Sequence, residues 1–123
     1  MVAIVDDDES LRRSVKNLLT SAGFRVETFA SAEDFLQSTR GGDDTGCVVL
    51  DLRMPGMSGF DLLLHLAAAG SRVPVIVLTA HTDEEARRRT LEAGAVAFLG
   101  KPFQCAALLG AVRRALEGAE SRC

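Results

Sequence analysis

The sequence has 123 residues, of which 47% are hydrophobic and 25% charged, and its formal net charge is −3. This size and composition are typical of one globular domain with a buried core. The mild acidity argues against a nucleic-acid-binding surface, and no apolar run approaches the roughly 20 residues of a membrane span. The cysteines (Cys47, Cys105, Cys123) are odd in number and widely spaced, which favours free thiols over disulfides. We therefore expect a cytoplasmic domain that contacts neither nucleic acid nor membrane.

The chain opens with a strand-like segment and then a helix-like one. Val2 to Val5 is a short apolar run that stops at Asp6-Asp7-Asp8. Leucine and valine then recur at helical spacing until Gly23, which is a common residue just after a helix. Basic residues are expected on the other face of this helix: Arg12, Arg13 and Lys16.

The next segments repeat this alternation. Phe24 to Phe29 alternates apolar and polar residues, as a half-buried strand does. Ser31-Ala32-Glu33-Asp34 resembles a capping box and predicts a short helix through Phe35 and Leu36. Residues 40–46 contain three glycines and two aspartates and predict a loop.

The most informative stretch surrounds Asp51. Cys47-Val48-Val49-Leu50 is an unbroken apolar run, which predicts a parallel strand buried on both faces. Pro55, Gly56 and Gly59 then break the chain, so Asp51 is expected at the carboxyl end of that strand. In open α/β sheets this is the edge where ligands bind.

The second half continues the pattern. Ser58 and Asp61 are spaced as a capping box for a helix, and Val73 to Leu78 is a continuous strand that ends at Thr79. Thr82-Asp83-Glu84-Glu85 predicts a further capped helix with acids in its first turn.

The last elements complete five strand–helix units. The fourth helix is expected to end at Gly94, and Ala95 to Leu99 predicts a strand that Gly100-Lys101-Pro102-Phe103 breaks. A final helix has its apolar stripe at Leu108, Leu109, Val112 and Leu116, with Arg113 and Arg114 outside. We predict an α/β fold: a five-stranded parallel sheet with helices on both faces, in the flavodoxin-like order. Residues 1–117 would form the domain, and 118–123 the start of a linker or a C-terminal tail.

Polar residues at the carboxyl ends of parallel strands should meet at one edge of the sheet. Here they are Asp6 and Asp7, Asp51, Thr79 and Lys101. Three carboxylates rarely gather without a cation, and an oxygen-rich site with few ligands suits Mg²⁺ more than Ca²⁺. A carboxylate can also be the nucleophile that forms an acyl phosphate, with cations around the transferring oxygens.

These segments, in this order, resemble the receiver domain of response regulators in two-component signalling. The resemblance covers residues 1 to about 117 and implies the flavodoxin-like (βα)5 receiver fold. The residues after Asp51 and those around Lys101 are similar to the FixJ-like branch of transcriptional regulators. The matching pieces are Ile4-Val5-Asp6-Asp7-Asp8, Asp51 to Gly59, Leu78-Thr79-Ala80, Gly94-Ala95 and Lys101-Pro102-Phe103.

The resemblance implies a role for each acid. Asp51 would be the phosphoacceptor. Asp7 and Asp51 would ligate Mg²⁺ together with the backbone carbonyl of Arg53, and Asp6 would act mainly through water. Asp8, one position further on, is expected to cap the first helix.

It also implies roles at the last two strand ends. Thr79 and Lys101 would each contact a phosphoryl oxygen, and the Lys101–Pro102 bond is expected to be cis. The switch aromatic, often Tyr in the family, is Phe98 here and has no hydroxyl, so it could equally be a core residue. His81 is expected on the surface, although it could lie beside the phosphoryl group or cap the next helix.

The implied function is signalling. A sensor histidine kinase would supply the phosphoryl group, and the face made by the fourth helix, fifth strand and fifth helix would change. The domain would catalyse only its own phosphorylation and dephosphorylation, and so would not be an enzyme with a separate substrate. It would control a transcriptional effector domain absent from this chain; the alternative is a free-standing single-domain phosphorelay protein.

A phosphorylation-dependent homodimer is also expected at this face, because its two helices carry opposite charges. The acids Asp83, Glu84 and Glu85 of one protomer would face Arg113 and Arg114 of the other. The alternative is that both are ordinary solvated faces.

Other functions fit the sequence less well. A haloacid-dehalogenase-type phosphatase needs a second aspartate two residues after the nucleophile, where this chain has Arg53. A flavin-binding flavodoxin needs a phosphate loop after the first strand, where Asp6-Asp7-Asp8 would repel phosphate. The nucleotide-binding P-loop sequence is missing.

Overall fold

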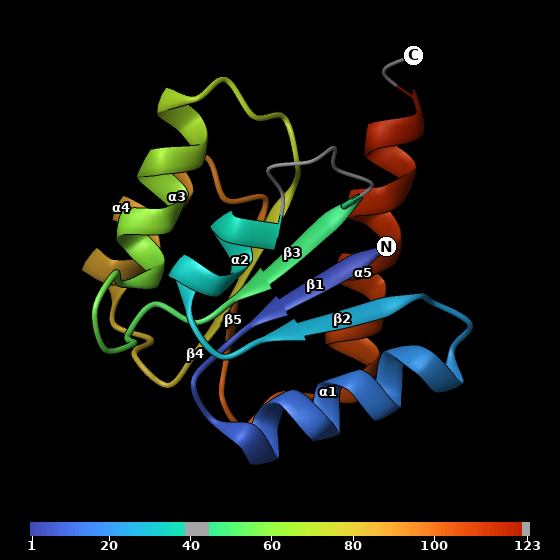
Figure 1. The fold of residues 1–123 in the computed structure, drawn as a ribbon. Helices are drawn as coiled ribbons and strands as arrows, with labels where there is room; N and C mark the ends of the chain where they lie inside the picture. Colours follow the sequence, from blue (N-terminus) through green and yellow to red (C-terminus); the bar gives the residue numbers. More distant parts are fainter. Residues whose placement is uncertain (39–44, 122–123) are drawn as a thin grey trace.

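Strands and helices alternate along the whole chain (Figure 1). The structure is a computed structural model that describes residues 1–38 and 45–121. The elements are β1 (Val2–Val5), α1 (Glu9–Ser21), β2 (Val26–Phe29), α2 (Ala32–Ser38), β3 (Cys47–Leu50), α3 (Gly59–Ala68), β4 (Val75–Thr79), α4 (Glu84–Glu92), β5 (Ala97–Gly100) and α5 (Cys105–Ser121).

The strands form one parallel sheet in the order β2-β1-β3-β4-β5. β3 is the central strand, and its Leu50 is in register with Val5 of β1 and Val77 of β4. β5 is an edge strand. The predicted five-stranded, flavodoxin-like fold is therefore confirmed, and the carboxyl ends of all five strands lie along one edge.

Two helical layers cover the sheet. Figure 1 shows α1 and α5 on one face and α2, α3 and α4 on the other. Successive strand residues point to opposite faces, so Val2 and Ile4 pack with α1 and α5, whereas Ala3 and Val5 pack beneath the other layer. Each face thus has its own apolar core, and the three central strands β1, β3 and β4 are buried along their length.

Some boundaries differ from those predicted. β5 begins at Ala97 rather than Ala95, because the Ala95 N–H still donates to the Thr90 carbonyl at the end of α4. β2 and β4 also begin two residues later than expected. The cap of α4 is Asp83, whose side chain accepts from Ala86 N, and not Thr82. The capping box of α3 and the Asp8 cap of α1 are confirmed.

The C-terminal helix is longer than predicted. α5 continues to Ser121, so 118–121 are helical; the division of the chain at residue 117 stays a prediction. The predicted loop at 40–46 lies largely outside the described residues, as does Cys123. Cys47 and Cys105 are free thiols, and burial raises the pKa of Cys47 to about 12. Within the described ranges, no helix is both long enough and apolar enough to cross a membrane.

Candidate functional site

The carboxyl edge of the sheet gathers buried polar side chains. Asp6 follows β1, Asp51 follows β3 and Thr79 ends β4; they are 2%, 8% and 0% exposed. Across the described residues only one other polar or charged side chain, Thr90, is buried. Because burying a polar group is unfavourable unless it is well partnered, this concentration marks a site and not an ordinary loop.

Three carboxylates converge there. One oxygen each of Asp6, Asp7 and Asp51 lies within 4.8 Å of the others. Asp7 is the exposed member and opens the cluster to solvent. A set of hard oxygen donors at this spacing is compatible with a divalent metal ion, which would also relieve the repulsion among the acids.

Lys101 closes the cluster from β5. Its Nζ donates to Asp6 Oδ2 at 2.9 Å and lies 3.5 Å from Asp51 Oδ2. The other oxygen of Asp6, Oδ1, accepts from the Asp8 N–H at 2.9 Å. The Lys101 N–H donates to the Thr79 carbonyl at 2.9 Å, and the Lys101–Pro102 bond is cis, as predicted.

Burial and charge shift two pKa values in this group. The pKa of Asp6 is raised, chiefly because burial disfavours its charged form, and the neighbouring charge of Asp51 adds to this. Burial acts to lower the pKa of Lys101, but its hydrogen bond with Asp6 and the charges of Asp6 and Asp51 outweigh that effect and raise it. Lys101 therefore remains a cation near neutral pH.

Thr79 and Phe98 lie on the strands next to the cluster. Thr79 Oγ1 accepts from the His81 N–H at 3.2 Å. Phe98 is half-buried, in register with Val77, and packs against the core beneath α2, α3 and α4. Phe98 is thus partly core, and its role as a switch stays a prediction. His81 is half-buried rather than fully on the surface.

The segment after Asp51 is held close to the strand end. The Gly59 N–H donates to the Leu52 carbonyl at 2.9 Å, and a Cβ at Gly59 would overlap the carbonyl oxygen of Asp51. Glu33 of α2 accepts from the Met57 N–H at 3.3 Å. Arg53 is exposed, and the role of its backbone carbonyl as a metal ligand stays a prediction.

Comparison with known proteins agrees with this geometry. The family model described as "Response regulator receiver domain" matches residues 2–113. The chain belongs to the receiver domain family. Members of this family are response-regulator modules that accept a phosphoryl group on an aspartate.

Its relatives place it near the FixJ-like branch, as predicted. The receiver domain is 46% identical over 117 residues to Nodulation protein W of Bradyrhizobium diazoefficiens, covering 95% of this chain and 51% of that protein. It is 44% identical over 115 residues to Transcriptional regulatory protein FixJ of Azorhizobium caulinodans, covering 94% of this chain and 54% of that protein. The chain thus spans about half the length of these relatives.

Solved structures show the same fold. The crystal structure of FixJ-N matches with a TM-score of 0.85 at 41% identity, covering 94% of this chain and 92% of that one. Response regulator StyR matches with a TM-score of 0.88 at 48% identity, covering 98% of this chain and 61% of that one.

One residue near the receiver site was not anticipated. Arg12 of α1 was expected among the basic residues facing away from the core, but it is half-buried and its Nη1 donates to the Asp6 carbonyl at 2.7 Å. Its neighbour Arg13 is exposed and pairs with Glu9 at 3.4 Å. Helical periodicity separates apolar from polar positions, and it could not distinguish these two arginines.

The charges on α4 also differ from expectation. Arg87 lies 3.6 Å from Glu84, and Arg88 lies 4.0 Å from Glu85. Asp83 is engaged in capping the helix. Arg88 makes its closer contact with Glu92, at 3.1 Å. Arginines of the same helix thus lie near Glu84 and Glu85, which reduces the charge complementarity expected across a dimer.

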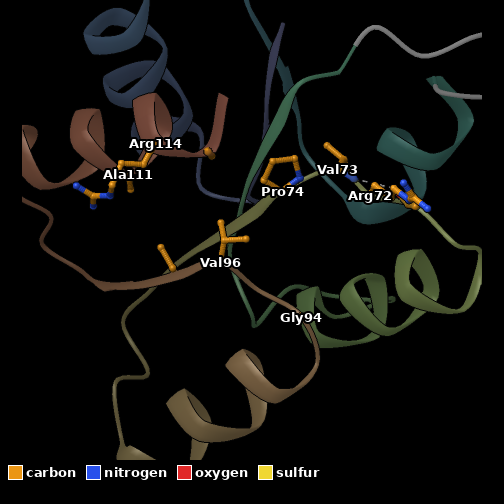
Figure 2. Close-up of a pocket in the computed structure, with 10 residues that line it drawn as sticks. Arg72, Val73, Pro74, Gly94, Val96, Ala111 and Arg114 are labelled. Atoms are coloured by element: carbon orange, nitrogen blue, oxygen red, sulfur yellow. Dashed lines mark hydrogen bonds between the residues drawn. The ribbon is translucent and has the colours of Figure 1, made fainter. Parts of the chain in front are cut away.

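The amino edge of the receiver sheet has a different character. A hollow of about 620 Å³ lies where β4 and β5 begin, against α5. Figure 2 shows Val96 near its centre, with Arg72 and Arg114 on opposite sides. The walls are mainly apolar or small residues, among them Val73, Pro74, Ala97, Ala111 and Ala115.

Proposed function

We propose that this receiver domain takes a phosphoryl group from a sensor histidine kinase onto Asp51. The observation that carries the proposal is the position of this residue. Asp51 follows the central strand, is 8% exposed, and shares its site with two other carboxylates and Lys101. A nucleophile held this way is restricted in geometry and flanked by a cation.

The transfer uses groups already in place. A carboxylate oxygen of Asp51 forms the O–P bond as the P–N bond of the phosphohistidine breaks, and the imidazole leaves with the electron pair. Lys101, 3.5 Å from Asp51 Oδ2, offsets charge on one phosphoryl oxygen. The Thr79 hydroxyl donates to another, because a phosphoryl oxygen can only accept; the Thr79 oxygen itself accepts from the His81 N–H.

We assign the acid cluster to Mg²⁺. Both carboxylate oxygens of Asp6 accept hydrogen bonds, one from Asp8 N–H and one from Lys101, which favours contact through water for Asp6. Asp7, Asp51 and the Arg53 carbonyl would then be the direct ligands. When bound, the cation neutralises the acids and the charge on the transferring oxygens.

The product is a switched state of the protein itself. The domain catalyses its own phosphorylation and dephosphorylation and turns over no separate substrate. Movement of Thr79 and Phe98 changes the α4-β5-α5 face, which regulates a transcriptional effector domain in a longer cytoplasmic protein. Support comes from FixJ, whose name is that of a transcriptional regulator and whose length is about twice that matched here.

Mass analysis tests the assignment of Asp51. The domain, incubated with acetyl phosphate and Mg²⁺, should gain one phosphoryl group, and Asp51→Asn should gain none. Asp61→Asn is the matched control, because Asp61 is an exposed aspartate of α3 that accepts from the Ser58 N–H, and its replacement should leave labelling intact. Stoichiometric labelling of Asp51→Asn would exclude Asp51 as the sole acceptor.

We also propose that phosphorylation promotes a weak homodimer through the α4-β5-α5 face. β5 is a sheet edge, and Arg113 and Arg114 are exposed on α5. Since exposed ion pairs are weak, the dimer should weaken with salt. Sedimentation of the beryllofluoride-bound domain should show a dimer that Arg113→Glu with Arg114→Glu disrupts. A monomer at low salt, or a dimer insensitive to both reversals, would reject this interface.

A further inference from the structure

Arg12 is the cation on α1 that reaches the acidic edge. It is half-buried, and its Nη1 lies 2.7 Å from the Asp6 carbonyl oxygen, a short charge-assisted hydrogen bond. This carbonyl belongs to the peptide that joins Asp6 to Asp7. The contact therefore acts on the backbone between two members of the acid cluster, and not on a carboxylate.

This contact affects the positions of both Asp6 and Asp7. The carboxylate of Asp6 is already fixed by Asp8 N–H and Lys101, each at 2.9 Å. Asp7 is exposed, so its direction depends on the orientation of the peptide that precedes it. A hydrogen bond to the oxygen of that peptide restrains its plane, and with it the direction in which the chain presents Asp7.

We propose that Arg12 is a positioning residue for the acid cluster. Its guanidinium orients the Asp6–Asp7 peptide so that Asp6, Asp7 and Asp51 can share one divalent cation. This inference rests on the proposed cation site, to which it adds a residue that contacts neither cation nor phosphoryl group.

Two effects of Arg12 on Mg²⁺ have opposite signs. As a positive charge near the site, Arg12 repels a divalent cation, and its removal would tighten Mg²⁺ binding. As a positioning residue it favours the binding geometry, and its removal would weaken binding. The sign of the change in dissociation constant therefore separates the two roles.

Titration calorimetry of the metal-free domain with Mg²⁺ makes the measurement. Arg12→Met should raise the dissociation constant roughly tenfold, as outer-shell changes commonly do. Arg12→Lys, which can still donate one hydrogen bond, should recover part of this loss. Arg13→Met is the matched control: it removes the same charge one residue away, where the arginine pairs with Glu9, and should change the constant less than twofold.

Phosphorylation supplies a second readout. With acetyl phosphate, the rate for Arg12→Met should be low at limiting Mg²⁺ and approach that of the native domain at saturating Mg²⁺. Amide shifts of Asp7 and Asp8 in the metal-free variant should change, whereas those of the β4–β5 region should not. Circular dichroism checks folding, and if Arg12→Met is unfolded, Arg12→Lys against Arg13→Lys decides the comparison.

The outcomes are distinguishable. Unchanged or tighter Mg²⁺ binding by a folded Arg12→Met would overturn the positioning role and leave the proposed function intact. Failure of the native domain to bind Mg²⁺ would overturn the cation site and this inference together. If Arg13→Met weakened Mg²⁺ binding as much as Arg12→Met, the effect would come from the charge of the helix in general, and the proposal would be rejected.

Discussion

The two edges of this parallel sheet are built from the same strands and differ in nearly every other respect. At the carboxyl edge, Asp6, Asp51 and Thr79 are buried, and Lys101 lies 2.9 Å from Asp6. At the amino edge, Val96 lines a hollow of about 620 Å³ and is 53% exposed. Buried polar groups are concentrated at the carboxyl edge, whereas the hollow at the amino edge is lined by small and apolar residues and by two exposed arginines.

The difference shows why one edge is suited to chemistry. At the carboxyl edge each polar group orients another: Asp8 N–H and Lys101 fix Asp6, and the Asp6 carbonyl engages Arg12. Such mutual hydrogen bonding holds charges in place before a ligand arrives. Arg72 and Arg114, which line the hollow, are exposed. Ordering a long arginine side chain costs conformational entropy, so these residues offer charge without a fixed geometry.

The largest contrast between the edges should come from the lysine. Lys101→Met removes the cation near Asp51, and phosphorylation by acetyl phosphate should slow by about 100-fold. Arg72→Gln, which removes a cation at the hollow, should leave the rate within about twofold. Time courses followed by intact mass give both rates. Similar rates for the two variants would show that the carboxyl-edge cation has no special role.

Metal should stabilise the folded domain through the carboxyl edge and not through the amino edge. We propose that Mg²⁺ binds the folded cluster, so a concentration ten times its dissociation constant should add about 1.4 kcal/mol to the unfolding free energy, or about 5 °C in Tm. Asp7→Ala should show a much smaller rise, and Arg72→Gln the full rise. Calorimetric melting with and without Mg²⁺ checks this, and equal shifts in native protein and Asp7→Ala would contradict the site.

The pH dependence of stability should also map to this edge. Because burial raises the pKa of Asp6 on folding, its ionisation costs stability as pH rises above the usual range of an aspartate pKa. The Lys101 contribution, from a raised lysine pKa, persists through that range and is lost only in strong alkali. Metal-free urea unfolding should thus show native protein losing stability relative to Asp6→Asn as pH rises, by at most about 1.4 kcal/mol per pH unit.

A control belongs with that experiment. Arg72→Gln removes no acid, so its stability should run parallel to that of the native domain over the same pH range. A native curve that rises relative to Asp6→Asn over this range would mean that pairing with Lys101 outweighs the burial of Asp6.

The smallest effect is expected at the hollow. Val96→Thr keeps the shape of a half-exposed side chain, so stability should change by no more than about 0.5 kcal/mol. Phosphorylation and Mg²⁺ affinity should be unaffected. Urea unfolding and the same labelling assay test this, and a tenfold loss of labelling would show that the two edges are energetically coupled.

The sequence predicted the topology and which residues meet at the carboxyl edge. Continuous apolar runs such as Val2–Val5 and Cys47–Leu50 identify buried parallel strands, and topology then brings their ends together. Local competition was harder: Thr82 and Asp83 are both good caps, and only the fold selects Asp83. The sequence could not predict the Arg12–Asp6 contact, because a side chain that reaches a backbone carbonyl leaves no residue-type signature.

The contact between Gly59 and the Asp51 carbonyl sets a limit on mutational tolerance. Gly70 and Gly94 have open space around a Cβ, but their positive φ would strain any residue with a side chain. Gly59 has no such φ, yet even alanine would place a methyl group inside the backbone of Asp51. In a saturation library selected for phosphorylation by acetyl phosphate, position 59 should retain glycine alone. One of the least variable positions of the domain would then be a residue with no side chain.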